Sequence, residues 1–396
     1  MSTLSLYVHI PFCISKCGYC DFNSYAMNGP IVSETVDAIL AEIRLSGYPK
    51  GTAQSIFFGG GTPTFLDSAS LQRILNSLRD RFPLAPEAEI TVEANPGTAD
   101  MQRFMDLRSA GFNRISIGVQ SFDDGLLHRL ERRHSAAEAA RAVGIAREAG
   151  FENINLDLMF GIPGQTETDW EKSLQSALSL QPEHISLYSL TIEPKTRFGH
   201  LQRIGQLPLP NEEAVLTMYE RAIEAARQAG FGHYEVSNFA KPGYQCRHNI
   251  NYWRNGPYAA YGPGAVSCLW EDAAGARYRR WTNELSPRKY CQKMESDETL
   301  AVEEETVSGM TALGESMMVG LRMMEGVSLS SLYQRYKIDM ALVYEREIAK
   351  LIERGLIGFT GDRIVLTHRG LLFANDVVLE FIALPEGNKF TVNPQN

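Results

Sequence analysis

Six short apolar runs recur through the first half of this chain, and they constrain its fold more than any other feature. They lie at 4–10, 55–58, 89–93, 114–119, 154–159 and 184–190. Segments with helical periodicity lie between them, at 35–45, 71–82, 101–110, 136–149 and 170–180. Parallel strands that are covered on both faces carry such nearly continuous apolar runs. The alternation predicts an α/β fold, either a doubly wound sheet or a full or partial barrel, and the spacing alone does not choose between these.

The chain is longer than one ordinary domain. Its 396 residues correspond to two or three domains at roughly 150 residues each. Past residue 240 the pattern changes to Gly, Pro and aromatic residues, which predicts an irregular linker over 241–300 after a first domain over 1–240. Helical runs then lead to an expected hairpin around Gly361 and Asp362 and to a helix that begins near Thr367. This order predicts a small winged-helix-like domain over 301–396.

Composition excludes several classes of protein. An apolar content of 44% and a charged content of 21% are typical of a folded globular chain. The net charge of −9 gives no support for a polyanion-binding surface, so we expect no nucleic-acid partner, and a nucleic-acid role for the winged-helix-like region has only topology behind it. The longest uncharged stretch, 255–270, is too short for a bilayer, which needs about 20 residues. With neither a transmembrane segment nor a secretory signal visible, we expect a cytoplasmic protein.

Three of the six cysteines form the strongest motif in the sequence. Cys13, Cys17 and Cys20 stand at C-x3-C-x2-C spacing directly after the first apolar run, and the other three are scattered through the second half. Reduced thiols are the expected state in a chain without a secretory signal. Three thiolates on one loop can hold three irons of a 4Fe-4S cluster and leave the fourth iron open to a substrate or cofactor. A structural zinc site is the alternative, but it needs a fourth ligand.

This cysteine spacing is the signature of the radical S-adenosylmethionine (SAM) superfamily, which the chain resembles along most of its length. The run GGGTPT at 59–64 follows the second apolar run and resembles the glycine motif that approaches the methionine part of SAM. The resemblance implies a partial (β/α)6 TIM-like barrel with a C-terminal winged-helix-like domain, and a site at the C-terminal strand ends. It also implies a set of SAM contacts, namely Tyr7, Tyr19, Gly60, Gly61, Thr62, Glu93, Gln120, Arg132 and Asp157. Taken singly, each has a structural alternative such as a strand-end cap or a solvated arginine.

Two features separate related groups within the superfamily. Oxygen-independent coproporphyrinogen III oxidases carry a further cysteine two residues after the third, where this chain has Phe22. A phenylalanine there is similar to the HemW-type haem chaperones. His248 begins the run HNINYW at 248–253, which resembles the H-N-x-x-Y-W motif of those chaperones. We expect this histidine to be an exposed axial ligand for haem iron, outside the barrel, although a histidine in general is more often structural.

The resemblance therefore implies a haem chaperone. Such a protein would carry a 4Fe-4S cluster and SAM, bind haem and deliver it to a haem-accepting apoprotein, which the family places at the membrane in respiration. The rival is a radical enzyme that decarboxylates coproporphyrinogen III, and Phe22 argues against it. If His248 is structural, the alternative haem ligands are Cys246, His233 or the methionines of the C-terminal part, for which core packing is the simpler explanation. The sequence leaves open whether SAM is cleaved in the normal cycle, which protein accepts haem and whether the chain forms a homodimer.

Overall fold

The computed structural model describes residues 3–48 and 51–382 and divides into two compact units. Unit 1 comprises Met1–Asn251, Pro257–Leu269 and Arg280–Glu305, and unit 2 comprises Tyr252–Gly256, Trp270–Arg279 and Thr306–Asn396. Because the chain passes between the units more than once, each unit contains segments that are distant in sequence.

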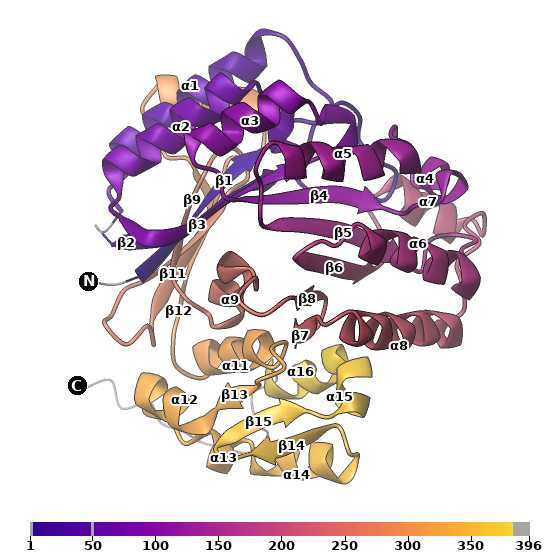
Figure 1. Ribbon diagram of the computed structural model, residues 1–396. Helices are drawn as coiled ribbons and strands as arrows, with labels where there is room; N and C mark the ends of the chain where they lie inside the picture. Colours follow the sequence, from indigo (N-terminus) through magenta and orange to yellow (C-terminus); the bar gives the residue numbers. More distant parts are fainter. Residues whose placement is uncertain (1–2, 49–50, 383–396) are drawn as a thin grey trace. The chain divides into compact units, whose positions relative to one another are not determined.

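Unit 1 is built around six neighbouring parallel strands, each followed by at least one helix (Figure 1). The strands are β1 (Thr3–Ile10), β2 (Thr52–Gly60), β3 (Leu84–Ala94), β4 (Arg114–Gln120), β5 (Ile154–Phe160) and β6 (His184–Ser189). The helices are α1 (Pro30–Leu45), α2 (Ser68–Arg81), α3 (Met101–Ala110), α4 (Asp124–Arg129), α5 (Ala136–Glu148), α6 (Glu167–Ser179), α7 (Arg197–Arg203) and α8 (Glu212–Gln228). All six expected strands and all five expected helices are present, and the predicted (β/α)6 architecture is confirmed.

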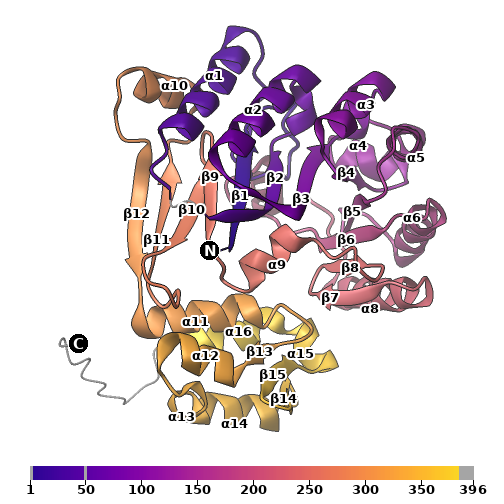
Figure 2. The same ribbon diagram turned by 60° about the vertical axis from the view of Figure 1, so that its left-hand side comes forward.

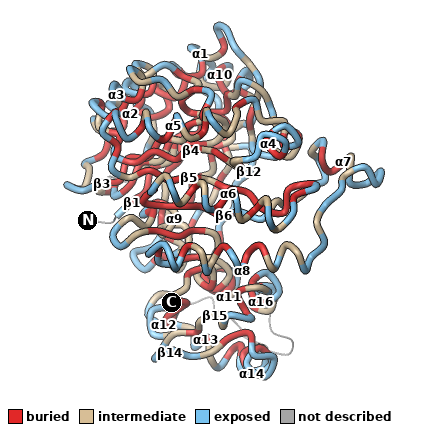
Figure 3. The backbone as a smooth tube through the Cα atoms, turned by 45° about the vertical axis from the view of Figure 1, so that its right-hand side comes forward, coloured by how far each residue is buried: buried red, intermediate tan, exposed pale blue. Residues whose placement is uncertain are grey.

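The core of unit 1 lies along these strands, as the apolar runs predict. Val8, Ile56, Val92, Ile117 and Leu156 come from five successive strands and are all 0% exposed. The buried residues follow the strands and the sheet-facing sides of the helices (Figure 3), and Figure 2 shows α1, α2 and α3 side by side along the sheet. Burial on both faces explains why the strand sequences are apolar without alternation.

Local signals fix where several helices begin. Ser135 and Glu138 form a capping box at the start of α5, and Thr166 and Asp169 form another at the start of α6. Each box satisfies backbone N–H groups that the first helical turn leaves without a partner. These two helices therefore begin where the sequence alone places a strong start.

The expected irregular linker over 241–300 is wrong, because most of this region is regular and extends the sheet. The order of the sheet is β12-β11-β10-β9-β1-β2-β3-β4-β5-β6-β8-β7, so strands are added at both ends. The added elements are β7 (Gly232–Glu235), β8 (Asn238–Ala240), α9 (Arg247–Trp253), β9 (Tyr258–Tyr261), β10 (Val266–Trp270), β11 (Tyr278–Asn283), α10 (Pro287–Glu295) and β12 (Ala301–Val307). Strand β9 pairs in parallel with β1, so the formation of this strand depends on a partner some 250 residues away in the sequence. Strands this short, flanked by turns that contain Gly and Pro, have too few residues to show a hydrophobic period, and the sequence therefore does not predict them.

Unit 2 contains a three-stranded antiparallel sheet of order β13-β15-β14, covered by helices. Its elements are α11 (Gly309–Gly320), β13 (Val327–Ser328), α12 (Leu329–Tyr336), α13 (Met340–Val343), α14 (Glu345–Glu353), β14 (Ile357–Thr360), β15 (Arg363–Leu366), α15 (His368–Leu372) and α16 (Ala374–Ile382). The hairpin around Gly361 and Asp362 is confirmed, and Thr367 caps the helix that begins at the next residue. Across residues 3–48 and 51–382, the helices lack the combination of length and apolar character that crossing a membrane requires.

Candidate functional site

The C-terminal ends of the parallel strands of unit 1 surround a cavity of about 680 Å³. The cysteine loop follows β1, the glycine motif follows from the end of β2, and polar side chains come from β3, β4 and β5. Eleven of the thirteen site residues expected from the sequence line this cavity. They are Cys13, Cys17, Tyr19, Cys20, Gly60, Gly61, Thr62, Glu93, Gln120, Arg132 and Asp157. Residues up to 144 positions apart are thus brought to one edge of the sheet, where a (β/α) fold places its chemistry.

The cysteine loop is held in shape by its own backbone and by one lysine. The Cys20 N–H donates to the Cys17 carbonyl over 3.1 Å. Lys16 Nζ donates to the carbonyl oxygens of Phe22 and Ser24, both over 3.1 Å. These bonds close the loop around its thiols, while the Phe22 side chain is 66% exposed at the cavity.

The cysteines fall into two groups that differ in exposure. Cys13, Cys17 and Cys20 are free and partly exposed, whereas Cys246, Cys268 and Cys291 are free and buried. Cys13 Sγ lies 3.6 Å from Thr62 Oγ1, and Arg132 Nη1 donates to Cys17 Sγ over 3.8 Å. Burial raises the pKa of the Cys13 thiol, although the bond to Thr62 opposes this. Because metals bind thiolates, a metal group at the loop would offset the free-energy cost of deprotonating the Cys13 thiol.

The donor set of the loop fits a cluster better than a single ion. Within the described ranges 3–48 and 51–382, no three His, Cys, Asp or Glu side chains converge closely enough to share one metal ion. In a 4Fe-4S cluster each thiolate binds a different iron, so its ligands stand farther apart than those of one tetrahedral zinc. Three partly exposed thiols on one loop, with Arg132 beside them to offset negative charge, suit such a cluster.

The glycine motif at the end of β2 is required by close packing against the start of the cysteine loop. Gly60 has φ of 111°, and a Cβ there would lie 2.6 Å from the His9 ring. A Cβ at Gly61 would lie 2.6 Å from the Phe12 carbonyl oxygen. Only glycine fits both positions. The motif therefore seats the loop after β2 against the segment that carries the cysteines, and the same two residues also line the cavity.

Two carboxyl groups face the cavity from β3 and β5. Burial raises the pKa of Glu93 to about 8, and the charge of nearby Asp157 adds to the effect. Burial also raises the pKa of Asp157, which accepts hydrogen bonds from Asn155 Nδ2 over 2.7 Å and Ser116 Oγ over 3.1 Å. Carboxyl groups in this setting favour a ligand that brings a positive charge or hydroxyl donors. The expected SAM carries both, as an ammonium group and ribose hydroxyls.

Gln120 and Arg132 are placed by an irregularity at the end of β4. Gln120 has φ of 67°, and the register with β5 shifts between Ile117 and Gln120. A bulge of this kind turns a side chain away from the regular alternation, here at the cavity. The Gly118 carbonyl accepts a hydrogen bond from Arg132 Nη2 over 2.6 Å. The strand end therefore presents Gln120 and holds the guanidinium that lies beside Cys17.

Two expected site residues do not line this cavity. Tyr7 lies behind it, with its hydroxyl hydrogen-bonded to His9 Nδ1 over 3.2 Å. His248 belongs to α9 in unit 1, the same unit as the cysteine loop, and is 1% exposed. Its Nδ1 is 2.9 Å from Ser55 Oγ and its ring stacks 5.1 Å from Phe57. The expectation of an exposed His248 outside the barrel is therefore wrong, because the helix that begins this motif packs the imidazole against β2.

Sequence reasoning missed several polar groups of the site. His134 lines the cavity, and burial lowers its pKa to about 4, with the charge of Arg132 as a further cause. Asn155 is 2% exposed and joins Asp157 to His184, whose Nδ1 lies 2.6 Å from Asn155 Oδ1. Arg114 is 2% exposed and its Nε is without a partner among the described residues. Arg114, Asn155 and His184 are signalled only as polar residues inside apolar strand runs, which does not say which face they occupy, and His134 lies outside the strands.

Two family models match the chain, one within unit 1 and one within unit 2. Residues 7–177 match the Radical SAM superfamily, and residues 307–373 match the HemN C-terminal domain. Among solved structures, the coproporphyrinogen III oxidase HemN from Escherichia coli, described as a radical SAM enzyme, matches with a TM-score of 0.81. That match covers 96% of this chain and 90% of the other at 23% identity, so it supports the fold alone.

Curated relatives match at higher identity over nearly the whole chain. The protein described as "Heme chaperone HemW" in Escherichia coli (strain K12) is 38% identical, covering 96% of this chain and 98% of that protein. The protein of the same description in Bacillus subtilis (strain 168) is also 38% identical, covering 96% of this chain and 99% of its own. With this identity along its length and the two matching domains, the chain belongs to the HemW family of the radical SAM superfamily.

Proposed function

We propose that this protein is a haem chaperone that carries a 4Fe-4S cluster and SAM, binds haem and passes it to a haem-requiring apoprotein. The observation that carries the proposal is the 38% identity, over nearly full length, to relatives described as heme chaperones. Phe22 at the cavity, in place of a further cysteine in the loop, supports a chaperone over an oxidase.

Cys13, Cys17 and Cys20 would hold the cluster. Their thiols share one loop at the cavity, and Arg132 beside Cys17 offsets the negative charge of the thiolates. When bound, a cluster with one iron free of protein ligands supplies a site for chelating SAM and a source of electrons. The loop bonds made by Lys16 keep the thiols together before the metal is bound.

The remaining cavity residues would bind SAM. Glu93 and Asp157 would accept hydrogen bonds from its ammonium and hydroxyl groups, which would offset the cost of ionising two buried carboxyl groups. Gln120 offers an amide at the strand end, and Thr62 lies between the glycine motif and Cys13. Tyr7 would act indirectly, since its hydroxyl is hydrogen-bonded to His9, whose ring lies against Gly60.

Anaerobic reconstitution provides the test. The purified chain is loaded with iron and sulfide, then titrated with SAM and with haem, and the haem-loaded form is mixed with a haem-free acceptor such as an apo-cytochrome b domain. We expect one haem per chain and transfer to the acceptor faster than from haem-loaded serum albumin. A parent protein that binds no haem would contradict the proposal. A membrane-associated respiratory acceptor is part of the proposal on family resemblance alone.

Coproporphyrinogen III decarboxylation is the rival outcome, and the same sample distinguishes it. The reconstituted protein is incubated with coproporphyrinogen III, SAM and a reductant, and the porphyrins are separated by chromatography. We expect no protoporphyrinogen, because the further loop cysteine is replaced by Phe22. Repeated turnover would replace the chaperone proposal with an oxidase.

A further inference from the structure

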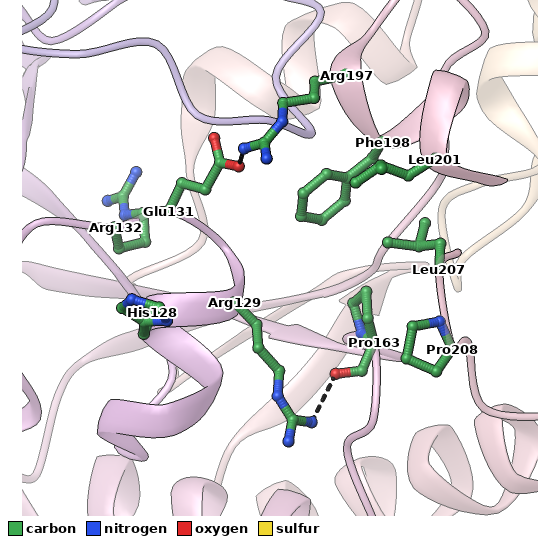
Figure 4. A pocket seen from close by; sticks show the side chains of 10 residues that line it. All are labelled: His128, Arg129, Glu131, Arg132, Pro163, Arg197, Phe198, Leu201, Leu207 and Pro208. Carbon is green, nitrogen blue, oxygen red and sulfur yellow. Dashed lines mark hydrogen bonds and ion pairs between the residues drawn. The ribbon is translucent and has the colours of Figure 1, made fainter. Parts of the chain in front are cut away.

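A second cavity in unit 1, of about 600 Å³, lies beside the cysteine loop and shares Glu131 and Arg132 with the site described above. Figure 4 shows its lining side chains, which come from α4, α7 and the loops around them. Leu201 and Leu207, which pack against the buried Phe198, supply an apolar wall, and Arg129 and Arg197 supply positive charge. A cavity of roughly 300–1,000 Å³ with an apolar wall and few polar groups is typical of a small-molecule site. The mixture of surfaces favours a flat apolar ligand that carries carboxylates.

The two guanidinium groups retain capacity to bind anions. Arg129 Nη1 donates to the Pro163 carbonyl over 3.0 Å, and its other N–H groups have no hydrogen-bond partner in the described part of the chain. Arg197 forms an ion pair with Glu131 at the rim, and its side chain is 64% exposed. Guanidinium groups bind carboxylates through paired hydrogen bonds. Two carboxylates of one ligand therefore find two separate partners here.

Histidine exposure points to the same cavity. Of the eight histidines, four are buried (His9, His134, His184 and His248) and His233 is partly buried against Phe239. The exposed ones are His128, His200 and His368. His128 lines this cavity, and its imidazole makes no hydrogen bond to any residue in 3–48 or 51–382. An axial haem ligand must reach the iron with a free ring nitrogen, which the buried His248 does not offer in this structure.

We propose that this cavity is the haem site, with His128 as an axial ligand, Arg129 and Arg197 as partners of the two propionates, and Leu201 and Leu207 against the macrocycle. The inference rests on the proposed haem chaperone function and names its binding site. Each part of haem would meet a group of matching chemistry. The iron would be bound by an imidazole without a hydrogen-bond partner, the propionates by guanidinium groups, and the ring by an apolar wall. Exposed residues at the rim leave haem a path out to an acceptor.

The same cavity contacts the cluster loop directly. The Phe198 N–H donates to the Gly18 carbonyl over 2.9 Å, and the Phe198 ring lies 6.2 Å from that of Tyr19. A Cβ at Gly18 would lie 2.8 Å from the Phe198 ring, so the loop and α7 are in close contact. Glu131 and Arg132 line both cavities. A ligand against Leu201 and Leu207 would therefore be separated from the cysteine loop by Phe198, and it would not displace any of the three cysteines.

The test uses the reconstituted full-length protein and absorbance titration with three probes: ferric haem, haem dimethyl ester and iron-free protoporphyrin IX. His128→Ala is expected to shift the haem absorption maximum and weaken haem binding at least tenfold, with little effect on protoporphyrin IX. Arg129→Gln/Arg197→Gln is expected to weaken haem binding at least tenfold and to abolish the preference for haem over its dimethyl ester. His200→Ala and Arg203→Gln, both exposed on α7 and outside the cavity lining, are the matched controls.

The outcomes separate the site from the function. If the parent binds one haem per chain and both variants bind it as the parent does, this site is wrong and the chaperone proposal stands. If the parent binds no haem, the proposed function fails and the site with it. Iron content and thermal unfolding check the fold of each variant. Should the double arginine variant not fold, the exposed His128→Ala variant alone decides, because an unchanged haem spectrum overturns the assignment.

Discussion

At the scale of single residues, the burial of charge determines how the candidate site responds to pH. Burial, with the charge of Asp157, raises the pKa of Glu93 to about 8 from an ordinary value of 4.5. A carboxyl group with a raised folded-state pKa contributes most to stability below about pH 4.5, and this contribution is lost as the pH rises through about 8. A cationic ligand has the opposite preference, because it binds the carboxylate form. Without a ligand, the site should therefore lower the free energy of unfolding at the pH values at which it would bind SAM most tightly.

Glu93→Gln tests this account. We expect the free energy of unfolding of the ligand-free variant to change less than that of the parent between about pH 5.5 and about pH 8.5. SAM binding should weaken roughly tenfold to hundredfold, because a hydrogen bond to a charged group contributes about 1.5–3 kcal/mol. Denaturant unfolding and equilibrium dialysis measure the two effects. Glu148→Gln, at an exposed position on α5, is the control. SAM affinity equal to the parent's would remove Glu93 from the SAM site.

The cysteines give a second prediction at this scale. Cys13→Ala, Cys17→Ala and Cys20→Ala should each lower the iron and sulfide bound after reconstitution from about four of each per chain to a small fraction. Cys268→Ala should keep the full amount, since Cys268 is 2% exposed and distant in sequence from the loop. Chemical analysis of iron and sulfide, with the absorption spectrum of the cluster, provides the measurement. A complete cluster in a triple variant of the loop would rule out these ligands.

At the scale of elements, the sequence predicts whatever depends on local periodicity or on chemistry at strand ends. The predicted strand at 114–119 corresponds to β4 (Arg114–Gln120), which is one residue longer. The prediction is accurate because a strand that is buried on both faces is marked by its sequence along its whole length. Glu93, Gln120 and Asp157 stand at or near strand ends, so their convergence follows from the parallel order of the sheet. What depends on distant partners is not predicted. Strand β9 is ordered by β1, and the cavity at His128 forms only where α4 meets α7.

Helix α9 shows the same limit and leads to a third prediction. His248 has an aromatic, Gly-rich sequence around it, which indicates exposure, yet its ring packs against Phe57 and bonds to Ser55. We expect His248→Ala to lower the free energy of unfolding by about 2–4 kcal/mol, through a cavity and the loss of the hydrogen bond between His248 and Ser55, whose hydroxyl keeps its bond to Ser5. The haem absorption maximum should stay at the parent's position. The sequence motif makes the opposite prediction, haem ligation by His248, and a shifted maximum with unchanged stability would support it over ligation by His128.

At the scale of the whole molecule, the fold of unit 2 depends on segments that interrupt unit 1. The Arg335 guanidinium lies 4.9 Å from the Trp270 ring centroid. Its Nε donates to the Gly275 carbonyl over 2.8 Å, and its Nη2 donates to the Asn255 carbonyl over 3.0 Å. All four residues belong to unit 2. One side chain on α12 therefore joins three separate stretches of chain, which explains why no single cut in the sequence separates the two units.

Replacing Arg335 tests whether this discontinuous unit is held as the contacts indicate. Arg335→Ala removes a donor from the carbonyl groups of Arg254, Asn255 and Gly275 and a cation from the Trp270 ring, so we expect the free energy of unfolding to fall by about 2–4 kcal/mol. Limited proteolysis should cut 270–279 faster than in the parent. Because the expected cluster cysteines lie in unit 1, the iron bound per chain should not change. Arg369→Ala, exposed on α15, should change the free energy by less than about 0.5 kcal/mol. If both variants unfold alike, the three stretches are held by other contacts.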